Sequence, residues 1–133
     1  MSEAILVVDD EPISLRFCCN VLNQSGYRVL AASSAAEALE VYRRETGIDL
    51  ILVDVVMPGM SGIELVRVLS AEHECPRIAL MSGYSPNEVE RLIGDEGSAY
   101  RIFWKPFEVP LFLKMIRNVL EAPVRGRVNR AVS

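Results

Sequence analysis

The chain has 133 residues, of which half are hydrophobic and about a quarter are charged, and its formal net charge is −4. This size and composition are typical of one globular domain with a buried core. No apolar run approaches the roughly 20 residues of a membrane helix, and the first residues lack the basic and apolar regions of a signal peptide. We therefore expect a cytoplasmic protein without a membrane anchor.

The charge is distributed unevenly along the chain. Residues 1–121 hold 11 basic and 18 acidic side chains, whereas residues 122–133 hold three arginines and no acid. An acidic body argues against nucleic acid as a partner, because surfaces that bind nucleic acid are basic. We assign residues 1–121 to one domain and interpret residues 122–133 as a disordered tail.

The hydrophobic pattern alternates between strands and helices five times. Continuous apolar runs are typical of strands that are buried on both faces, and apolar residues at helical spacing predict amphipathic helices. The predicted strands are 4–8, 27–32, 49–53, 77–81 and 100–104, and the predicted helices are 12–24, 35–45, 63–72, 86–93 and 108–120. Short connections in this order predict an α/β domain with a parallel sheet and right-handed crossovers.

Local signals mark the ends and faces of the helices. Asp10 before Pro12 is a candidate N-cap, and two Ser-x-x-Glu sequences, beginning at Ser34 and Ser85, predict capping boxes. In the first helix the apolar residues at helical spacing are Ile13, Phe17, Val21 and Leu22. In the last helix we expect Leu111, Met115, Ile116 and Val119 to face inward.

Polar side chains follow four of the five predicted strands. Asp9 and Asp10 follow the first strand, Asp54 the third, Ser82 the fourth and Lys105 the fifth. The carboxyl ends of parallel strands meet at one edge of the sheet, where open α/β folds bind their ligands. The sequence therefore predicts three carboxylates, a hydroxyl and an ammonium in one shallow cleft.

These groups suit a divalent cation and a phosphoryl group. At an effective dielectric near 20, two carboxylates ~4 Å apart repel by roughly 4 kcal/mol, and a bound Mg²⁺ turns this repulsion into attraction. Each residue also has a structural explanation: Asp54 could open a loop, Asp10 cap a helix, Ser82 form a turn and Lys105 lie along the surface. The combination, in this order, favours the functional explanation.

The cysteines and the one histidine give no sign of another site. The three cysteines form no C-x-x-C pair, so neither a disulfide framework nor a zinc site is indicated. Cys18 and Cys19 lie in a predicted helix and are interpreted as core residues or surface thiols. His73 lies at a helix end and is interpreted as a surface residue.

Four segments together resemble the receiver domains of two-component response regulators. They are Leu6-Val7-Val8-Asp9-Asp10-Glu11, Asp54-Val55-Val56-Met57-Pro58-Gly59-Met60-Ser61-Gly62, Met81-Ser82-Gly83-Tyr84 and Lys105-Pro106-Phe107. The resemblance covers about residues 3–121. It implies a doubly wound, flavodoxin-like (βα)5 sandwich of three layers, with a five-stranded parallel sheet of order 2-1-3-4-5.

The resemblance also implies roles for the candidate residues. Asp54 would accept the phosphoryl group, while Asp9, Asp10, Asp54 and the backbone carbonyl of Val56 would hold Mg²⁺. Ser82 and Lys105 would contact the phosphoryl oxygens. The Lys105-Pro106 peptide bond would be cis, as is usual in the family.

Further expectations from the resemblance concern partners. The donor would be a phosphohistidine of a histidine kinase or a histidine phosphotransfer domain, and a protein target would read the result. The module would not be a turnover enzyme. The changed surface would comprise the fourth helix, fifth strand and fifth helix, through which members of the family also form homodimers. The chain would act either alone or as the receiver of a hybrid sensor kinase.

The chain departs from the family pattern at one switch position. The aromatic residue usual three positions before the lysine is replaced by Ile102, which has no hydroxyl to report a conformational change; Tyr84 is a candidate substitute. Val56 and Tyr84 occupy two positions that often tune phosphoryl lifetime. We expect them to shield the phosphoryl group from water.

Three alternative functions are consistent with parts of the sequence. A pseudo-receiver would keep the fold as a protein-binding scaffold without phosphorylation. An aspartyl-phosphate hydrolase usually has a second acid where this chain has Val56, and it needs a cap region. A flavodoxin-like FMN protein would need a phosphate loop where Asp9, Asp10 and Glu11 stand.

Overall fold

A computed structural model describes residues 2–57, 59–72, 76–94 and 100–122. Strands and helices alternate throughout this part of the chain. The strands are β1 (Ala4–Val8), β2 (Arg28–Ala32), β3 (Ile48–Asp54), β4 (Arg77–Ser82) and β5 (Arg101–Trp104). The helices are α1 (Pro12–Gln24), α2 (Ala35–Arg44), α3 (Gly62–Ser70), α4 (Pro86–Ile93) and α5 (Val109–Glu121).

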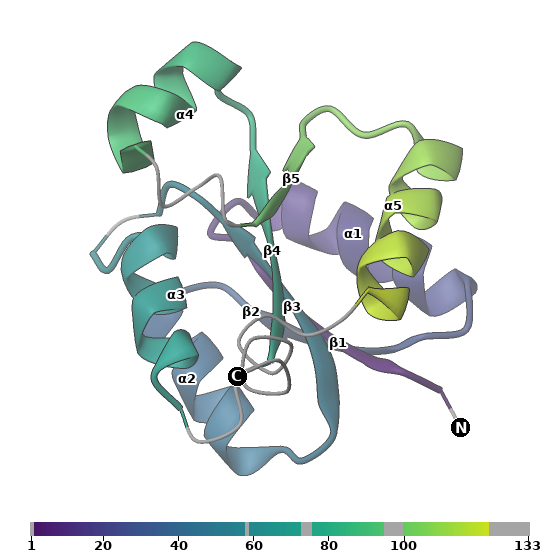
Figure 1. Cartoon of the computed structure of the whole chain (residues 1–133). Helices are drawn as coiled ribbons and strands as arrows, with labels where there is room; N and C mark the ends of the chain where they lie inside the picture. Colours follow the sequence, from purple (N-terminus) through teal and green to yellow (C-terminus); the bar gives the residue numbers. More distant parts are fainter. Residues whose placement is uncertain (1, 58, 73–75, 95–99, 123–133) are drawn as a thin grey trace, which may run out of the picture.

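The five strands form one parallel sheet in the order β2-β1-β3-β4-β5, as the family resemblance implied. Helices α1 and α5 lie on one side of this sheet, and α2, α3 and α4 lie on the other (Figure 1). β2 is added on one side of β1, whereas β3, β4 and β5 are added in turn on the other side, so the strand order reverses between β1 and β3. Their carboxyl ends therefore form the topological switch point of a doubly wound fold.

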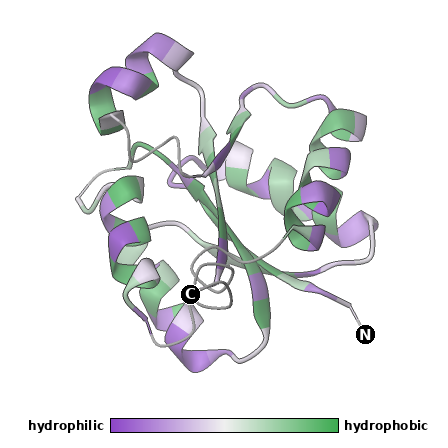
Figure 2. Ribbon diagram, in the orientation of Figure 1, coloured by the Kyte–Doolittle hydropathy of each residue, from purple (hydrophilic) through white to green (hydrophobic). Residues whose placement is uncertain are grey.

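The central strands are buried on both faces. All five residues of β1 are buried, as are the last five residues of both β3 and β4. The hydrophobic colouring is concentrated along these strands in Figure 2. A buried parallel strand has no polar face, which explains why the sequence shows continuous apolar runs rather than alternation.

Two core clusters lie on the two faces of the sheet. Leu6, Ile51 and Leu80 point toward the cluster beneath α2, α3 and α4. Their strand neighbours, among them Ile5, Leu50 and Met81, point toward the cluster beneath α1 and α5. Because successive strand residues point to opposite faces, β5 divides in the same way: Ile102 packs on the first cluster and Phe103 belongs to the second.

The expectation that Leu111 faces inward proved wrong. Leu111 of α5 is 55% exposed, and Ile13, one of the apolar residues at helical spacing in α1, is 77% exposed. The buried residues of α5 are Phe112, Ile116 and Leu120, and those of α1 are Cys18 and Leu22. Both helices are apolar over more of their circumference than they bury, so the spacing indicated the helix without fixing which side packs on the sheet.

The helix ends also differ in part from the expectations. Glu11, not Asp10, occupies the N-cap position of α1, and its side chain makes no capping bond. The capping box at Ser85 is confirmed. Ser34 caps α2 as predicted, but the Glu37 side chain bonds to Ser33 instead of returning to Ser34.

Strand boundaries shift slightly from the predictions. Asp54 and Ser82 are the last residues of β3 and β4, rather than the first residues beyond them. Across the described ranges, no helix has the length and apolar character needed to cross a membrane. The predicted tail from residue 123 onward, His73 and the thiol of Cys75 lie outside the described residues.

Candidate phosphoryl-acceptor and metal site

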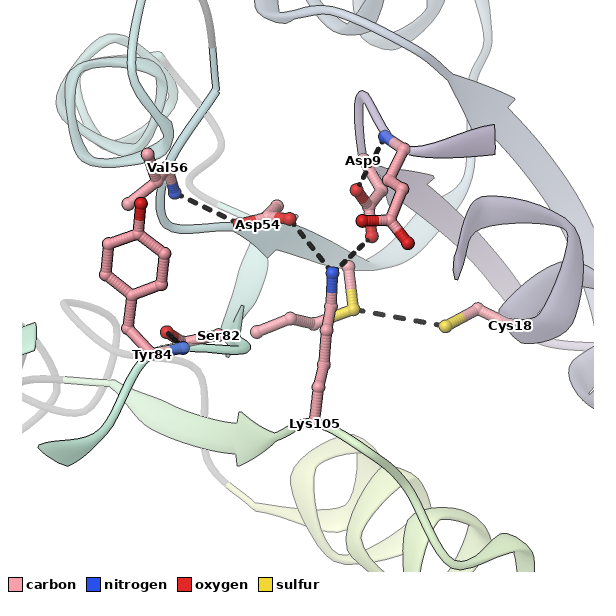
Figure 3. Close-up of polar contacts among 9 residues, drawn as sticks. Asp9, Cys18, Asp54, Val56, Ser82, Tyr84 and Lys105 are labelled. Atoms are coloured by element: carbon pink, nitrogen blue, oxygen red, sulfur yellow. Dashed lines mark hydrogen bonds and ion pairs between the residues drawn. The ribbon is translucent and has the colours of Figure 1, made fainter. Parts of the chain in front are cut away.

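Side chains from four strand ends converge at the carboxyl edge of the sheet (Figure 3). Asp9 follows β1, Asp54 ends β3, Ser82 ends β4 and Lys105 follows β5. Because β1 and β3 are hydrogen-bonded neighbours, Asp9 and Asp54 lie beside one another at the switch point. The convergence predicted from the parallel topology is therefore present.

Lys105 bridges two of the carboxylates. Its Nζ atom lies 2.7 Å from Oδ2 of Asp9 and 3.0 Å from Oδ2 of Asp54 (Figure 3). The lysine side chain is largely buried, and both carboxylates are buried as well. An isolated charge at this depth would be strongly disfavoured, so each of the three groups depends on the others.

The strand ends use the same local hydrogen bond. The backbone N–H of Glu11 donates to Oδ1 of Asp9 at 3.0 Å, and that of Val56 donates to Oδ1 of Asp54 at 3.0 Å. Likewise, the N–H of Tyr84 donates to the Ser82 hydroxyl at 2.9 Å. In each case a side chain binds the backbone two residues further on, which is the Asx- or Ser/Thr-turn geometry. These bonds fix the side-chain oxygens where the chain leaves the sheet.

The distribution of buried polar groups isolates this site from the rest of the molecule. Within the described ranges, Asp9, Asp54 and Ser82 are the only buried polar or charged residues. All three belong to the site. Since burial of polar groups costs free energy unless they are paired, their concentration at one edge is typical of a functional centre rather than of ordinary core packing.

The electrostatic environment separates the two buried carboxylates. Burial raises the pKa of Asp54 to about 6, although the hydrogen bond from Lys105 opposes this. Burial also tends to raise the pKa of Asp9, but the bonds from Lys105 and the Glu11 N–H outweigh it and leave the pKa below its usual value. Burial lowers the pKa of Lys105, while Asp9 and Asp54 raise it to a net value above normal. Near neutral pH the site therefore holds an ammonium between two carboxylates.

Asp9, Asp10 and Asp54 can converge on one cation. Each offers a carboxylate oxygen, and these oxygens lie within 4.8 Å of one another. Hard oxygen donors are the ligands that Mg²⁺ prefers, and Asp10 is exposed, so the cation would keep access to water. The donor set thus fits Mg²⁺. The contribution of the Val56 carbonyl stays a prediction.

An open cavity of about 410 Å³ covers the site. It is lined by Asp10, Glu11, Pro12, Asp54, Val56, Ser82, Gly83, Tyr84 and Lys105. Val56 is 38% exposed and Tyr84 is 45% exposed, and the Tyr84 ring extends toward Val56 in Figure 3. The two side chains form an apolar border on one side of Asp54.

Sequence reasoning missed some of the cavity lining. Glu11 and Gly83 were not assigned a role, although each directly follows a residue that was, and this adjacency is the signal that could have found them. The expected cis peptide bond between Lys105 and Pro106 is confirmed. Ser82 and Lys105 are further joined through the backbone, because the Lys105 N–H donates to the Ser82 carbonyl at 2.8 Å.

Comparisons with known proteins agree on one family. The family model described as the response regulator receiver domain matches residues 5–117. The sporulation initiation phosphotransferase F of Bacillus subtilis is 34% identical over 121 residues, covering 90% of this chain and 95% of that protein. The polar-differentiation response regulator DivK of Brucella ovis is 29% identical over 123 residues, covering 90% and 98%. Among solved structures, a response regulator from Thermotoga maritima superimposes with a TM-score of 0.78 at 26% identity, over 92% of this chain and all of that one.

Proposed function

The chain belongs to the receiver domains of response regulators, and we propose that it accepts a phosphoryl group on Asp54 from a phosphohistidine of a partner protein. The observation that supports this most is the concentration of buried polar residues at the switch point, with Lys105 between Asp9 and Asp54. The name of the Bacillus relative, a phosphotransferase, is consistent with a role in phosphoryl relay.

In the proposed reaction, a carboxylate oxygen of Asp54 attacks phosphorus in line with the departing imidazole nitrogen. The P–N bond breaks as the P–O bond forms, so the group passes from one side chain to the other. The pKa of Asp54, about 6, leaves most of the carboxylate ionised and nucleophilic at neutral pH. The Val56 N–H holds one of its oxygens in a fixed direction.

Lys105 and Ser82 would stabilise the charge that develops on the phosphoryl oxygens. The Lys105 ammonium already lies 3.0 Å from Asp54, so it needs only a small displacement to reach a group attached there. The Ser82 hydroxyl accepts a bond from the Tyr84 N–H, which leaves its own hydrogen able to donate. Asp9, Asp10, Asp54 and the Val56 carbonyl would hold Mg²⁺, which, when bound, neutralises charge on the transferred group.

The partner assignments rest on the same proposal. A histidine kinase or a histidine phosphotransfer domain in the cytoplasm would supply the phosphohistidine, and the exposed Ile13, adjacent to the cavity residue Pro12, offers an apolar contact for it. A protein target would read the phosphorylated state on the α4-β5-α5 surface, where Leu92, Trp104 and Leu111 are exposed. The domain would be a phosphoacceptor and not a turnover enzyme.

Phosphorylation with a small-molecule donor tests the proposal. The protein is incubated with Mg²⁺ and acetyl phosphate, and the modified residue is mapped by mass spectrometry. We expect the mass of one phosphoryl group on the peptide that contains Asp54, dependent on Mg²⁺ and absent from Asp54→Asn. Modification that survives in Asp54→Asn, or that never occurs, would contradict the proposal and favour a non-phosphorylated scaffold.

A further inference from the structure

The four phenylalanines of the chain form one cluster beside the site. The sequence contains four in total, Phe17, Phe103, Phe107 and Phe112, and we call these the phenylalanine cluster. They come from α1, β5, the β5–α5 turn and α5. The cluster therefore joins three secondary-structure elements on the α1–α5 side of the sheet.

Phe107 is the centre of the phenylalanine cluster. Its ring is stacked on Phe112 with centroids 4.8 Å apart and on Phe17 with centroids 6.4 Å apart, and it meets the edge of Phe103 at 6.5 Å. Such aromatic contacts have preferred geometries, so a displacement of the central ring changes the packing of the rings that contact it. Phe107 thus contacts one ring from each of α1, β5 and α5.

Phe107 is also tied closely to the proposed phosphoryl site. It lies two residues after Lys105, whose ammonium contacts Asp9 and Asp54. The Lys105 backbone is in turn bonded to the carbonyl of Ser82. A phosphoryl group on Asp54 would draw the Ser82 hydroxyl and the Lys105 ammonium toward itself, and both movements act on the turn that carries Phe107.

The structure provides room for the Phe107 ring to respond. A pocket of about 290 Å³ that opens to the surface lies beside the phenylalanine cluster, and its lining includes Phe103, Trp104, Pro106, Phe107, Phe112 and Met115. A closely packed core resists gradual deformation, so a ring that borders an open pocket can change position where a fully enclosed ring cannot. Phe17, which stacks on Phe107 from α1, is 37% exposed and is thus accessible to a partner at the surface.

On the opposite face of β5 from Phe103, the side chain is that of Ile102. Ile102 is aliphatic and packs against the core cluster beneath α2, α3 and α4. It carries no hydroxyl. The ring-to-ring contacts of Phe103 with Phe107 and Phe112 lie on the α1–α5 side of β5.

We infer that the phenylalanine cluster transmits the phosphorylated state of Asp54 through Phe107 to the exposed surface of α1 at Phe17. The inference rests on the proposed function. It adds a second surface that changes on phosphorylation, on the other side of the sheet from α4. A partner that contacts Phe17 would then distinguish the two states of Asp54 without contacting the acidic site.

Fluorine NMR tests the inference directly, because every phenylalanine belongs to the phenylalanine cluster. The full chain is labelled with 4-fluorophenylalanine, and its four resonances are assigned by single Phe→Leu variants. Mg²⁺ and beryllofluoride, a mimic of the phosphoryl group on Asp54, are then titrated. We expect saturable shifts of the Phe107 and Phe17 resonances, and loss of the Phe17 shift in Phe107→Leu.

The matched control is Ile102→Val, on the other face of β5, which should keep the Phe17 shift. The inference would be overturned by a Phe17 resonance that stays fixed while the other fluorine resonances shift to saturation. It would also be overturned by a Phe17 shift that persists in Phe107→Leu. Circular dichroism of each variant establishes that it is folded. Absence of any saturable change, together with no phosphorylation of Asp54, would instead reject the proposed function, and this inference with it.

Discussion

Gly62, the first residue of α3, lies against the backbone of Asp54 with no room for a side chain between them. A Cβ atom placed on Gly62 would overlap the Asp54 carbonyl oxygen and would lie 2.9 Å from Cα of Val55. The Gly62 N–H donates to the Val55 carbonyl at 3.1 Å. The end of α3 is thereby fixed to the strand end that carries the proposed phosphoacceptor.

We expect Gly62→Ala to destabilise the fold by about 2 kcal/mol or more, because its methyl group meets rigid backbone rather than a movable side chain. Urea unfolding followed by circular dichroism measures the change. Gly83→Ala is the matched control, since a Cβ there would meet its nearest neighbour, Lys105 Cδ, at an ordinary distance of 3.9 Å. Equal stabilities of the two variants would show that the close approach at Gly62 is unimportant.

The pKa of Asp54 predicts how stability depends on pH without Mg²⁺. Burial raises this pKa from 3.8 in the unfolded chain to about 6 in the fold, so between these values the folded state binds more protons. The free energy of unfolding therefore falls as pH rises from 4 to 6 on account of Asp54, and the cost of the ionised group is fully present above pH 6. Asp54→Asn removes this cost.

We thus expect Asp54→Asn to match the wild type at pH 4 and to be more stable by roughly 1–3 kcal/mol at pH 7.5 in EDTA. Denaturant unfolding at a series of pH values gives the difference. Adding MgCl2 should stabilise the wild type and leave the variant nearly unchanged, since the cation needs the carboxylate. A stability difference that is the same at pH 4 and pH 7.5 would argue against a raised pKa.

The border formed by Val56 and Tyr84 predicts slow loss of the phosphoryl group. Both residues line the cavity over Asp54, and their apolar surfaces would restrict the approach of water to a phosphoryl group on Asp54. In Val56→Asn/Tyr84→Ser we expect hydrolysis to be about tenfold faster, which corresponds to ~1.4 kcal/mol of barrier. Decay of radiolabelled phosphoprotein measures the rate. Leu92→Asn, an exposed change outside the cavity, should leave it unaltered; equal rates in all three proteins would refute the shielding.

Much of the fold and of the candidate site could be predicted from the sequence because the signals are local. Continuous apolar runs indicated buried strands, and the polar residues at the ends of those runs indicated the site. The strand order came from the family resemblance, since periodicity alone does not say which strands are neighbours. Parallel geometry then brought Asp9, Asp54 and Lys105 together from three separate parts of the chain.

What the sequence did not reveal depends on the packing of distant segments. The exposure of Leu111 and Ile13 is decided by how far each helix is rotated about its axis, and a broad apolar stripe leaves that angle open. The need for glycine at position 62 arises from contact with the end of β3. The capping box from Ser61 to Glu64 was, by contrast, a local signal that was overlooked.

The Cys18 thiol lies beneath the site, and its environment predicts that it is unreactive in the folded protein. Its Sγ atom is fully buried and contacts Sδ of Met81 at 4.0 Å. Burial, with a smaller contribution from the charge of Asp9, raises the pKa of the Cys18 thiol to about 12. At pH 8 only about one thiol in ten thousand would then be ionised, and the thiolate is the reactive form.

We expect N-ethylmaleimide to leave Cys18 unmodified in the folded protein and to modify it once urea unfolds the chain, with the modified positions identified by tandem mass spectrometry. The neighbouring Cys19, which is partly exposed, is an internal control in the same peptide and should react first. Rapid modification of Cys18 under native conditions would mean that α1 separates readily from the sheet beneath the site.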